Sequence, residues 1–175
     1  MSPLEELISS TELRIKDAQS RSDYHAVTEI SMQFNDSVSN LDKCVDVLNK
    51  ELTASYDKCG SLRENLVLCA AWDHADLSSV DILCALLARP DRSNSVEMIV
   101  DLLFKIPSPK SVPFLVAAFS RKYNYDIYDE IAVKCLDALA EINTADAWDA
   151  IKGALTSPSE RIREHAQELL EFRPI

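Results

Sequence analysis

The histidines of this sequence and their neighbouring acids offer little for catalysis or metal binding. The tightest cluster is Asp73-His74-Ala75-Asp76, at the end of an expected helix. The helix dipole favours a histidine at that end, so we expect a solvated turn rather than a metal ligand or a general base. His165 follows Glu164 within the last expected helix, and we expect it to be half-buried and hydrogen-bonded. We therefore assign no catalytic residue, no metal ligand and no cofactor.

The cysteines follow the apolar pattern of the chain and form no redox or metal motif. There are five, an odd number, and no Cys-x-x-Cys occurs: Cys44, Cys59, Cys69, Cys84 and Cys135. Four lie in apolar helical patterns, where a free cysteine behaves as a small buried hydrophobic residue. Cys59, between a lysine and a glycine, is the one that we expect to be exposed, but a nucleophilic thiol also needs a base. This usage predicts free thiols in a reducing cytoplasm.

The segment from Tyr123 to Glu130 is the strongest candidate for a binding site. It holds three of the five tyrosines and three acids, and it contains no basic residue. Tyrosine is common among the residues that dominate protein interfaces, and acids steer the approach of a basic partner. We assign partner binding to six residues of this segment: Tyr123, Tyr125, Asp126, Tyr128, Asp129 and Glu130.

A structural interpretation of the same segment stays open. Tyr123 or Tyr125 would then hold the loop against the helices, and Tyr128 would pack in the core. The acids would stabilise the N-terminus of the following helix, where a carboxylate contributes about 0.3–1 kcal/mol.

The elements that would position this segment are pairs of helices with a repeated apolar pattern. Residues 108–172 contain two such pairs. In each pair, the first helix has apolar residues at i, i+3 and i+7, and the second helix has them at i, i+4, i+7 and i+10. These spacings place a row of side chains on one face of an α-helix. The rows are Val112, Leu115, Phe119 and Trp148, Ile151, Leu155 in the first helices, and Ala132, Leu136, Leu139, Ile142 and Ile162, Ala166, Leu169, Phe172 in the second.

The same register continues toward the N-terminus, with neighbouring units offset by 30 to 36 residues. Seven apolar columns align over four units in residues 37–175, and the last of them reads Trp72, Ile106, Ile142 and Phe172. Residues 1–36 form an atypical helix pair, which begins at the capping box Ser2-Pro3-Leu4-Glu5 and suits the cap of a solenoid. We predict an all-α, right-handed solenoid of about ten helices without a sheet, with residues 1–175 as a single domain.

The register also identifies the tyrosine-rich segment as an insertion. Phe119 and Ala132, at the end of one helix and the start of the next, are thirteen residues apart, whereas Leu155 and Ile162 in the following unit are seven apart. An insertion in one repeat forms a loop at one edge, often the edge that binds. The shorter connection contains Ser157-Pro-Ser-Glu160, which we expect to be the strongest helix cap of the chain.

The segment Glu160-Arg-Ile-Arg-Glu-His-Ala-Gln-Glu-Leu-Leu-Glu-Phe172 resembles the second helix of short bacterial HEAT repeats, with an arginine, an apolar pair, then Ala and Leu-Leu. The resemblance covers about 37–172, although the units are shorter than the ~40–47 residues of typical HEAT and armadillo repeats. It implies that the second helices line a concave face. The exposed columns of that face would read Glu64, Met98, Lys134, Glu164 and Val67, Asp101, Asp137, Gln167. We assign Asp101, Asp137 and Glu164 to a second, mildly acidic binding surface.

The composition favours a basic protein as partner. The chain has 175 residues and a net charge of −11, and 47% of its residues are hydrophobic. A packed core is therefore expected, while nucleic acid and anionic membranes are poor partners. With only two glycines it lacks glycine-rich phosphate loops. Residues 1–6 have no basic region and no apolar run reaches about 20 residues, so we expect no signal peptide, no membrane span, and a cytoplasmic protein that is monomeric alone.

Three functions fit these observations. Free-standing acidic HEAT-like proteins of this size resemble the immunity proteins of bacterial toxin–immunity systems, including contact-dependent growth inhibition. That resemblance implies a protein without enzymatic activity that covers the active site of a cognate toxin, such as a basic nuclease. The second possibility is an adaptor that holds two proteins together. The third is a HEAT-like enzyme, such as a lyase or an iron-dependent hydroxylase. Enzymes of the iron type use repeated His-Glu dipeptides, and this chain has none.

Overall fold

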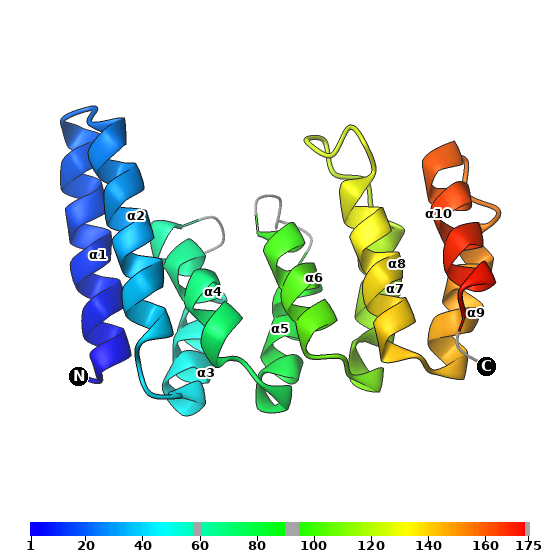
Figure 1. Cartoon of the computed structure of the whole chain (residues 1–175), viewed down its shortest axis with the longest axis horizontal. Helices are drawn as coiled ribbons and strands as arrows, with labels where there is room; N and C mark the ends of the chain where they lie inside the picture. The colour runs from blue at the N-terminus through cyan, green and yellow to red at the C-terminus, as the bar shows by residue number, and fades with distance from the viewer. Residues whose placement is uncertain (58–60, 90–94, 174–175) are drawn as a thin grey trace. The chain divides into compact units, whose positions relative to one another are not determined.

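The structure is a computed structural model that describes residues 1–57, 61–89 and 95–173 (Figure 1). Over these residues the protein is all-α, with ten α-helices, two short 3-10 helices and no strand. The helices are α1 (Pro3–Ser20), α2 (Tyr24–Ser39), α3 (Val45–Ala54), α4 (Leu62–His74), η1 (Leu77–Ser79), α5 (Val80–Leu87), α6 (Val96–Lys105), η2 (Pro109–Ser111), α7 (Val112–Phe119), α8 (Glu130–Ile142), α9 (Ala145–Ala154) and α10 (Glu160–Glu171). The predicted all-α class and the number of helices are confirmed.

Within the described ranges, every helix falls short of the combined length and apolar character that a membrane-spanning segment requires.

The chain divides into two compact units, Met1–Ser79 and Val80–Ile175. Unit 1 contains α1 to α4, and unit 2 contains α5 to α10. The boundary lies immediately before α5, where the apolar register places the start of a helix pair. The single domain predicted for residues 1–175 stays a prediction.

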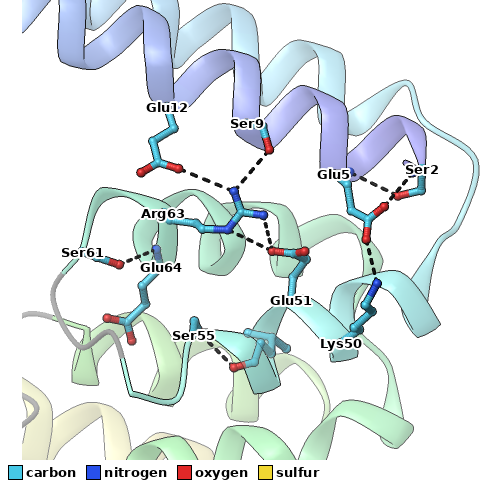
Figure 2. A network of polar contacts seen from close by, with 11 residues as sticks. Ser2, Glu5, Ser9, Glu12, Lys50, Glu51, Ser55, Ser61, Arg63 and Glu64 are labelled. Atoms are coloured by element: carbon cyan, nitrogen blue, oxygen red, sulfur yellow. Dashed lines mark hydrogen bonds and ion pairs between the residues drawn. The ribbon is translucent and has the colours of Figure 1, made fainter.

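The first helix of unit 1 begins at the predicted capping box. The Ser2 hydroxyl accepts a hydrogen bond from the amide of Glu5 (3.2 Å), and the Glu5 carboxylate accepts one from the amide of Ser2 (2.7 Å). Glu5 also pairs with Lys50 of α3 (3.0 Å; Figure 2). The hydrogen bond from the Ser2 amide, and then the one from Lys50, lower the pKa of Glu5 from its ordinary value of 4.5 to about 2. The box therefore caps α1 and also ties it to α3.

We expect Glu5 to make the protein sensitive to acid. A carboxyl group whose pKa is lowered by folding stabilises the fold above its unfolded pKa, 4.5 for Glu5, and this contribution is lost as the pH falls toward the folded pKa. In urea unfolding between about pH 5 and pH 3, the Glu5→Gln variant should therefore lose less stability than the wild type. Equal losses in the two proteins would show that Glu5 is not held in the folded state as its contacts indicate.

An ion-pair network joins α1, α3 and α4 around Arg63 (Figure 2). The guanidinium donates two hydrogen bonds to one oxygen of Glu51, from Nη2 (2.6 Å) and Nε (3.1 Å). It also donates to the Ser9 hydroxyl (3.3 Å) and lies 3.5 Å from the Glu12 carboxylate. Glu51 is buried, so its charge is stable there only because it is paired. The network thus fixes α4 against both α1 and α3.

The exposure of α4 differs from the sequence prediction at four positions. Glu64 and Val67, expected on an open face, are fully buried, and His74, expected in a solvated turn, is buried as well. Trp72, expected in the core, is 50% exposed. Helix α4 packs against α1, α2 and α3, so neighbours cover most of its circumference. A helix enclosed on several sides has no single apolar stripe. The spacing of its apolar residues therefore assigned the wrong positions of α4 to the core and to the solvent.

Unit 2 consists of three helix pairs, α5–α6, α7–α8 and α9–α10 (Figure 1). Helices α5, α7 and α9 contact one another in order, and so do α6, α8 and α10, which gives two layers. The apolar columns predicted for these helices are mostly buried: Val80, Leu83, Leu87, Val96, Val100, Leu103, Val112, Leu115, Ala132, Leu136, Leu139, Ile142, Trp148, Ile151, Ile162 and Ala166. Leu155 and Phe172 are exposed, contrary to prediction, because each follows the last residue of its helix, where the chain leaves the packed surface.

Candidate partner-binding site

The predicted insertion is a loop between α7 and α8, and Asp126 anchors it to α8. The two carboxylate oxygens of Asp126 accept hydrogen bonds from the first two amides of the helix, those of Glu130 (2.8 Å) and Ile131 (2.9 Å). Asp129, next to the helix, has a left-handed backbone (φ 56°, ψ 28°), and its side chain forms no cap. Asp126 therefore does what the structural interpretation of the segment expects of its acids.

Residues at the start of α10 hold the end of the loop that leads into α8. The Ser159 hydroxyl donates to Asp129 (2.7 Å), and Arg161 donates to the carbonyl oxygen of Tyr128 (2.6 Å) and to the carboxylate of Glu130 (2.6 Å). The Ser159 side chain, directed to Asp129, accepts no hydrogen bond from an amide of α10, so the prediction of a strong cap there is wrong. All three acids of the loop thus have polar partners within unit 2.

The three tyrosines of the loop differ in exposure. Tyr123 is half-buried, and its hydroxyl is enclosed without a hydrogen-bond partner among the described residues. Its ring centroid lies 6.0 Å from that of Tyr125. Burial raises the pKa of Tyr123, and it raises the pKa of Tyr125 to about 12. Tyr123 therefore holds the loop against unit 2, whereas the alternative that Tyr128 packs in the core is wrong, because Tyr128 is 66% exposed.

Three large side chains at the end of the loop face the solvent, and together we call them the apolar tip: Tyr125 (44% exposed), Ile127 (75%) and Tyr128. Ile127 was not among the predicted site residues, because that prediction rested on the tyrosines and acids of this segment. One feature of the sequence could have identified it: Ile127 is a large apolar residue that belongs to the apolar row of neither neighbouring helix. The loop thus engages the carboxylates of Asp126 and Asp129 within unit 2 and exposes three large side chains to water, the reverse of the usual arrangement.

A cavity of about 700 Å³ lies beside the loop, within unit 2. One wall comes from loop residues that include Asp126 and Asp129, and the other from the connection between α9 and α10, including Ser157 and Ser159. Gly153 of α9 opens onto the cavity, since a Cβ atom at this position would meet no atom within 4 Å. The volume is within the range of ligand-binding pockets, about 300–1,000 Å³.

Two acids of the second predicted surface are paired within unit 2. Lys134 of α8 pairs with Asp101 of α6 (2.8 Å), and Nε2 of His165 of α10 lies 2.7 Å from the Asp137 carboxylate of α8. These contacts fasten α6 to α8 and α8 to α10. His165 is half-buried and hydrogen-bonded, as predicted. Asp101 and Asp137 therefore have a structural role, whereas Glu164 is exposed.

The residues considered for catalysis have structural surroundings. Nε2 of the buried His74 lies 3.2 Å from the carbonyl oxygen of Val38, at the end of α2. Cys84 and Cys135 are buried, and every described cysteine is free, while Cys59 lies outside the described residues. Over the part of the chain that the structure describes, no three residues among His, Cys, Asp and Glu are grouped so that they could hold a metal ion.

We expect Cys84 and Cys135 to react slowly with thiol reagents in the folded protein. Burial raises the pKa of Cys84 to about 11 and also raises that of Cys135, so little thiolate is present near neutral pH. A disulfide reagent should label these two residues only after unfolding in urea, as identified by mass spectrometry of the labelled peptides. Rapid labelling of either residue in the native protein would contradict its burial.

Compared with known proteins, the chain matches no protein-family model, no curated protein and no solved structure at a significant level. Its function therefore has to be argued from the site, because function depends on sites and not on the fold alone. The apolar tip and the cavity beside the loop are two features of unit 2 that its internal packing leaves unexplained.

Proposed function

We propose that this chain is a protein-binding module and that the apolar tip is the centre of its binding surface. The main support is that three large side chains face water on a loop whose acids are all engaged internally. Covering apolar surface is favourable by about 25 cal/mol per Å², so the tip gains from a partner. Aromatic anchors of this kind dominate the energetics of many protein interfaces.

The contacts of the loop support binding because they order it before a partner arrives. Asp126 attaches the loop to α8, while Ser159 and Arg161 attach it to the start of α10. Fixing the backbone of one residue costs about 1–2 kcal/mol. A loop that is already fixed does not lose this free energy on binding, so more of the contact energy appears as affinity.

A finer proposal concerns the fold family and the partner. We propose that the helix pairs are repeats of a right-handed HEAT-like solenoid, and that the protein is an immunity protein of a contact-dependent growth inhibition system. It would bind a toxin, such as a basic nuclease, and cover its active site without catalysing a reaction itself. The layered pairs of unit 2 and the net charge of −11 support this proposal. An adaptor would differ by binding two partners at once.

Isolation of the partner followed by binding measurements tests the proposed function. The tagged chain is purified from its native host, and its stoichiometric partner is identified by mass spectrometry and purified. We expect one basic protein. Ile127→Ala and Tyr128→Ala should each weaken its binding about fivefold or more in calorimetry, because truncating an interface anchor costs more than about 1 kcal/mol. Their stability should be unchanged, since both side chains face water.

Tyr24→Ala is the matched control, because Tyr24 is an exposed tyrosine of α2 in unit 1. This variant should bind the partner as tightly as the wild type. If Ile127→Ala and Tyr128→Ala also bind normally, the apolar tip is not the binding surface. If the full chain retains no protein in a stoichiometric complex, the proposal of a binding module is wrong.

A further inference from the structure

We infer that the cavity beside the loop receives an arginine side chain of the protein partner. The inference rests on the proposed function and identifies the chemistry that the same surface recognises. The cavity, of about 700 Å³, has room for an arginine together with part of the neighbouring peptide. Its lining consists of an acceptor-rich polar part and an apolar part, and both suit this side chain.

Three of the five hydroxyl groups that line the cavity are left as acceptors. Ser120 and Thr156 each donate their hydrogen to a carbonyl oxygen of their own preceding helical turn (2.9 Å in both cases), and Ser159 donates to Asp129 (2.7 Å). A hydroxyl group has one hydrogen and two lone pairs, so after donating it can only accept. A group that enters the cavity and bonds to these oxygens must therefore be a donor.

The charged groups of the lining also favour a cation. Asp126 and Asp129 both line the cavity, and their partners are amides and a hydroxyl rather than a basic side chain. Of the cations that line it, Arg121 directs its guanidinium to carbonyl oxygens at the end of α5, including that of Arg89 (3.0 Å). Lys122 is exposed. Each carboxylate has more lone pairs than these hydrogen bonds use, so both can also accept from a positive group of a partner.

The apolar part of the lining suits the stem of an arginine. Phe119, Ala132, Ala154 and Ile162 contribute apolar side chains to the cavity. Arginine packs its methylene groups on apolar surface while its guanidinium reaches acceptors. The guanidinium has five donors in a planar fork that matches carboxylates, whereas lysine has a compact point charge. We therefore expect arginine to bind more tightly than lysine.

The test uses the full chain and three peptides: acetyl-Gly-Arg-Gly-amide, its lysine analogue, and its citrulline analogue, in which an uncharged urea group replaces the guanidinium. In amide NMR titrations, the arginine peptide should shift the signals of Gly153, Thr156, Ser157 and Ser159. The citrulline peptide should bind at least about tenfold more weakly, because it lacks the charge that the carboxylates attract. The lysine peptide should lie between the two.

Three variants locate the binding. Gly153→Phe should abolish it by filling the cavity, and the helix tolerates this change because glycine is the poorer helix former. Gly153→Ala adds one methyl group and should bind within about twofold of the wild type, which makes it the matched control. Asp129→Asn should weaken binding about tenfold, since asparagine removes the charge, still accepts from Ser159 and tolerates the left-handed backbone.

Equal binding of the arginine and citrulline peptides would overturn the inference, as would normal binding to Gly153→Phe or an absence of shifts around the cavity at millimolar peptide. The apolar-tip variants Ile127→Ala and Tyr128→Ala should bind the arginine peptide normally. The two proposals can therefore fail separately. If these variants also bind the partner normally while the peptide still occupies the cavity, only the role of the apolar tip is refuted.

Discussion

Replacing Arg63 by methionine should destabilise unit 1 by about 3–5 kcal/mol. The change keeps a long side chain but removes the guanidinium, and it leaves Glu51 as a buried carboxylate without its nearest cation. Removing one member of a buried ion pair costs this much because the remaining charge stays desolvated. Urea unfolding measures the effect. In a Trp148→Phe background, fluorescence of Trp72 reports on unit 1, because the chain has only these two tryptophans and they lie in different units.

Two further variants separate the buried ion pair from a general effect of charge. Arg21→Met removes an exposed cation that pairs with Asp17 (3.1 Å), and it should change the unfolding free energy by less than about 1 kcal/mol. The double variant Arg63→Met/Glu51→Met removes both buried charges and should recover most of the lost stability. If Arg63→Met is as stable as Arg21→Met, the network does not hold α4 in place.

The elements of the fold could be predicted because their signals are local. The capping box at Ser2 depends on residues three positions apart, and the structure confirms both of its hydrogen bonds. The rows of Val112 and Leu115 and of Leu136 and Leu139 are buried as predicted, since each row needs only the period of one helix. These signals were sufficient for the all-α class and the number of helices.

The surroundings of α4 could not be predicted in the same way. Its buried positions depend on three other helices that pack around it, and the sequence of residues 62–74 does not indicate how many helices pack against α4. The buried Glu64 shows the consequence most clearly, because a glutamate within an apolar pattern is normally assigned to the solvent face. Period and propensity describe one helix, whereas burial is decided by its neighbours.

For the loop, too, features set by nearby residues could be predicted, whereas features set by residues distant in the sequence could not. Its position and length followed from the helical register, but the roles within it did not. Ser159 looks like a helix cap in sequence, yet its hydroxyl bonds to Asp129, thirty residues earlier. Asp126 rather than Asp129 receives the amides of α8 because the backbone turns left-handed at Asp129. Ile127 is exposed to water, and no spacing rule identifies it.

Asp126→Ala should therefore weaken partner binding about hundredfold, although Asp126 is not part of the apolar tip. Alanine leaves the first two amides of α8 without their acceptor, which should also lower the stability of unit 2 by about 1–2 kcal/mol. The released loop must be ordered again on binding. At about 1–2 kcal/mol for each residue, two or three residues account for the loss of affinity. Hydrogen exchange should show faster exchange of the Glu130 and Ile131 amides.

Two controls separate loop order from electrostatic attraction. Asp126→Asn keeps an oxygen that can accept from one of the two amides, so its affinity should fall between those of the wild type and Asp126→Ala. Asp146→Ala removes the same charge from an exposed acid in the first turn of α9, and it should bind within about twofold of the wild type. Normal binding by Asp126→Ala, with rapid exchange of both amides, would mean that the apolar tip does not depend on a preordered loop. Equal losses in Asp126→Ala and Asp146→Ala would instead assign the effect to charge, because only the first of these changes touches the loop.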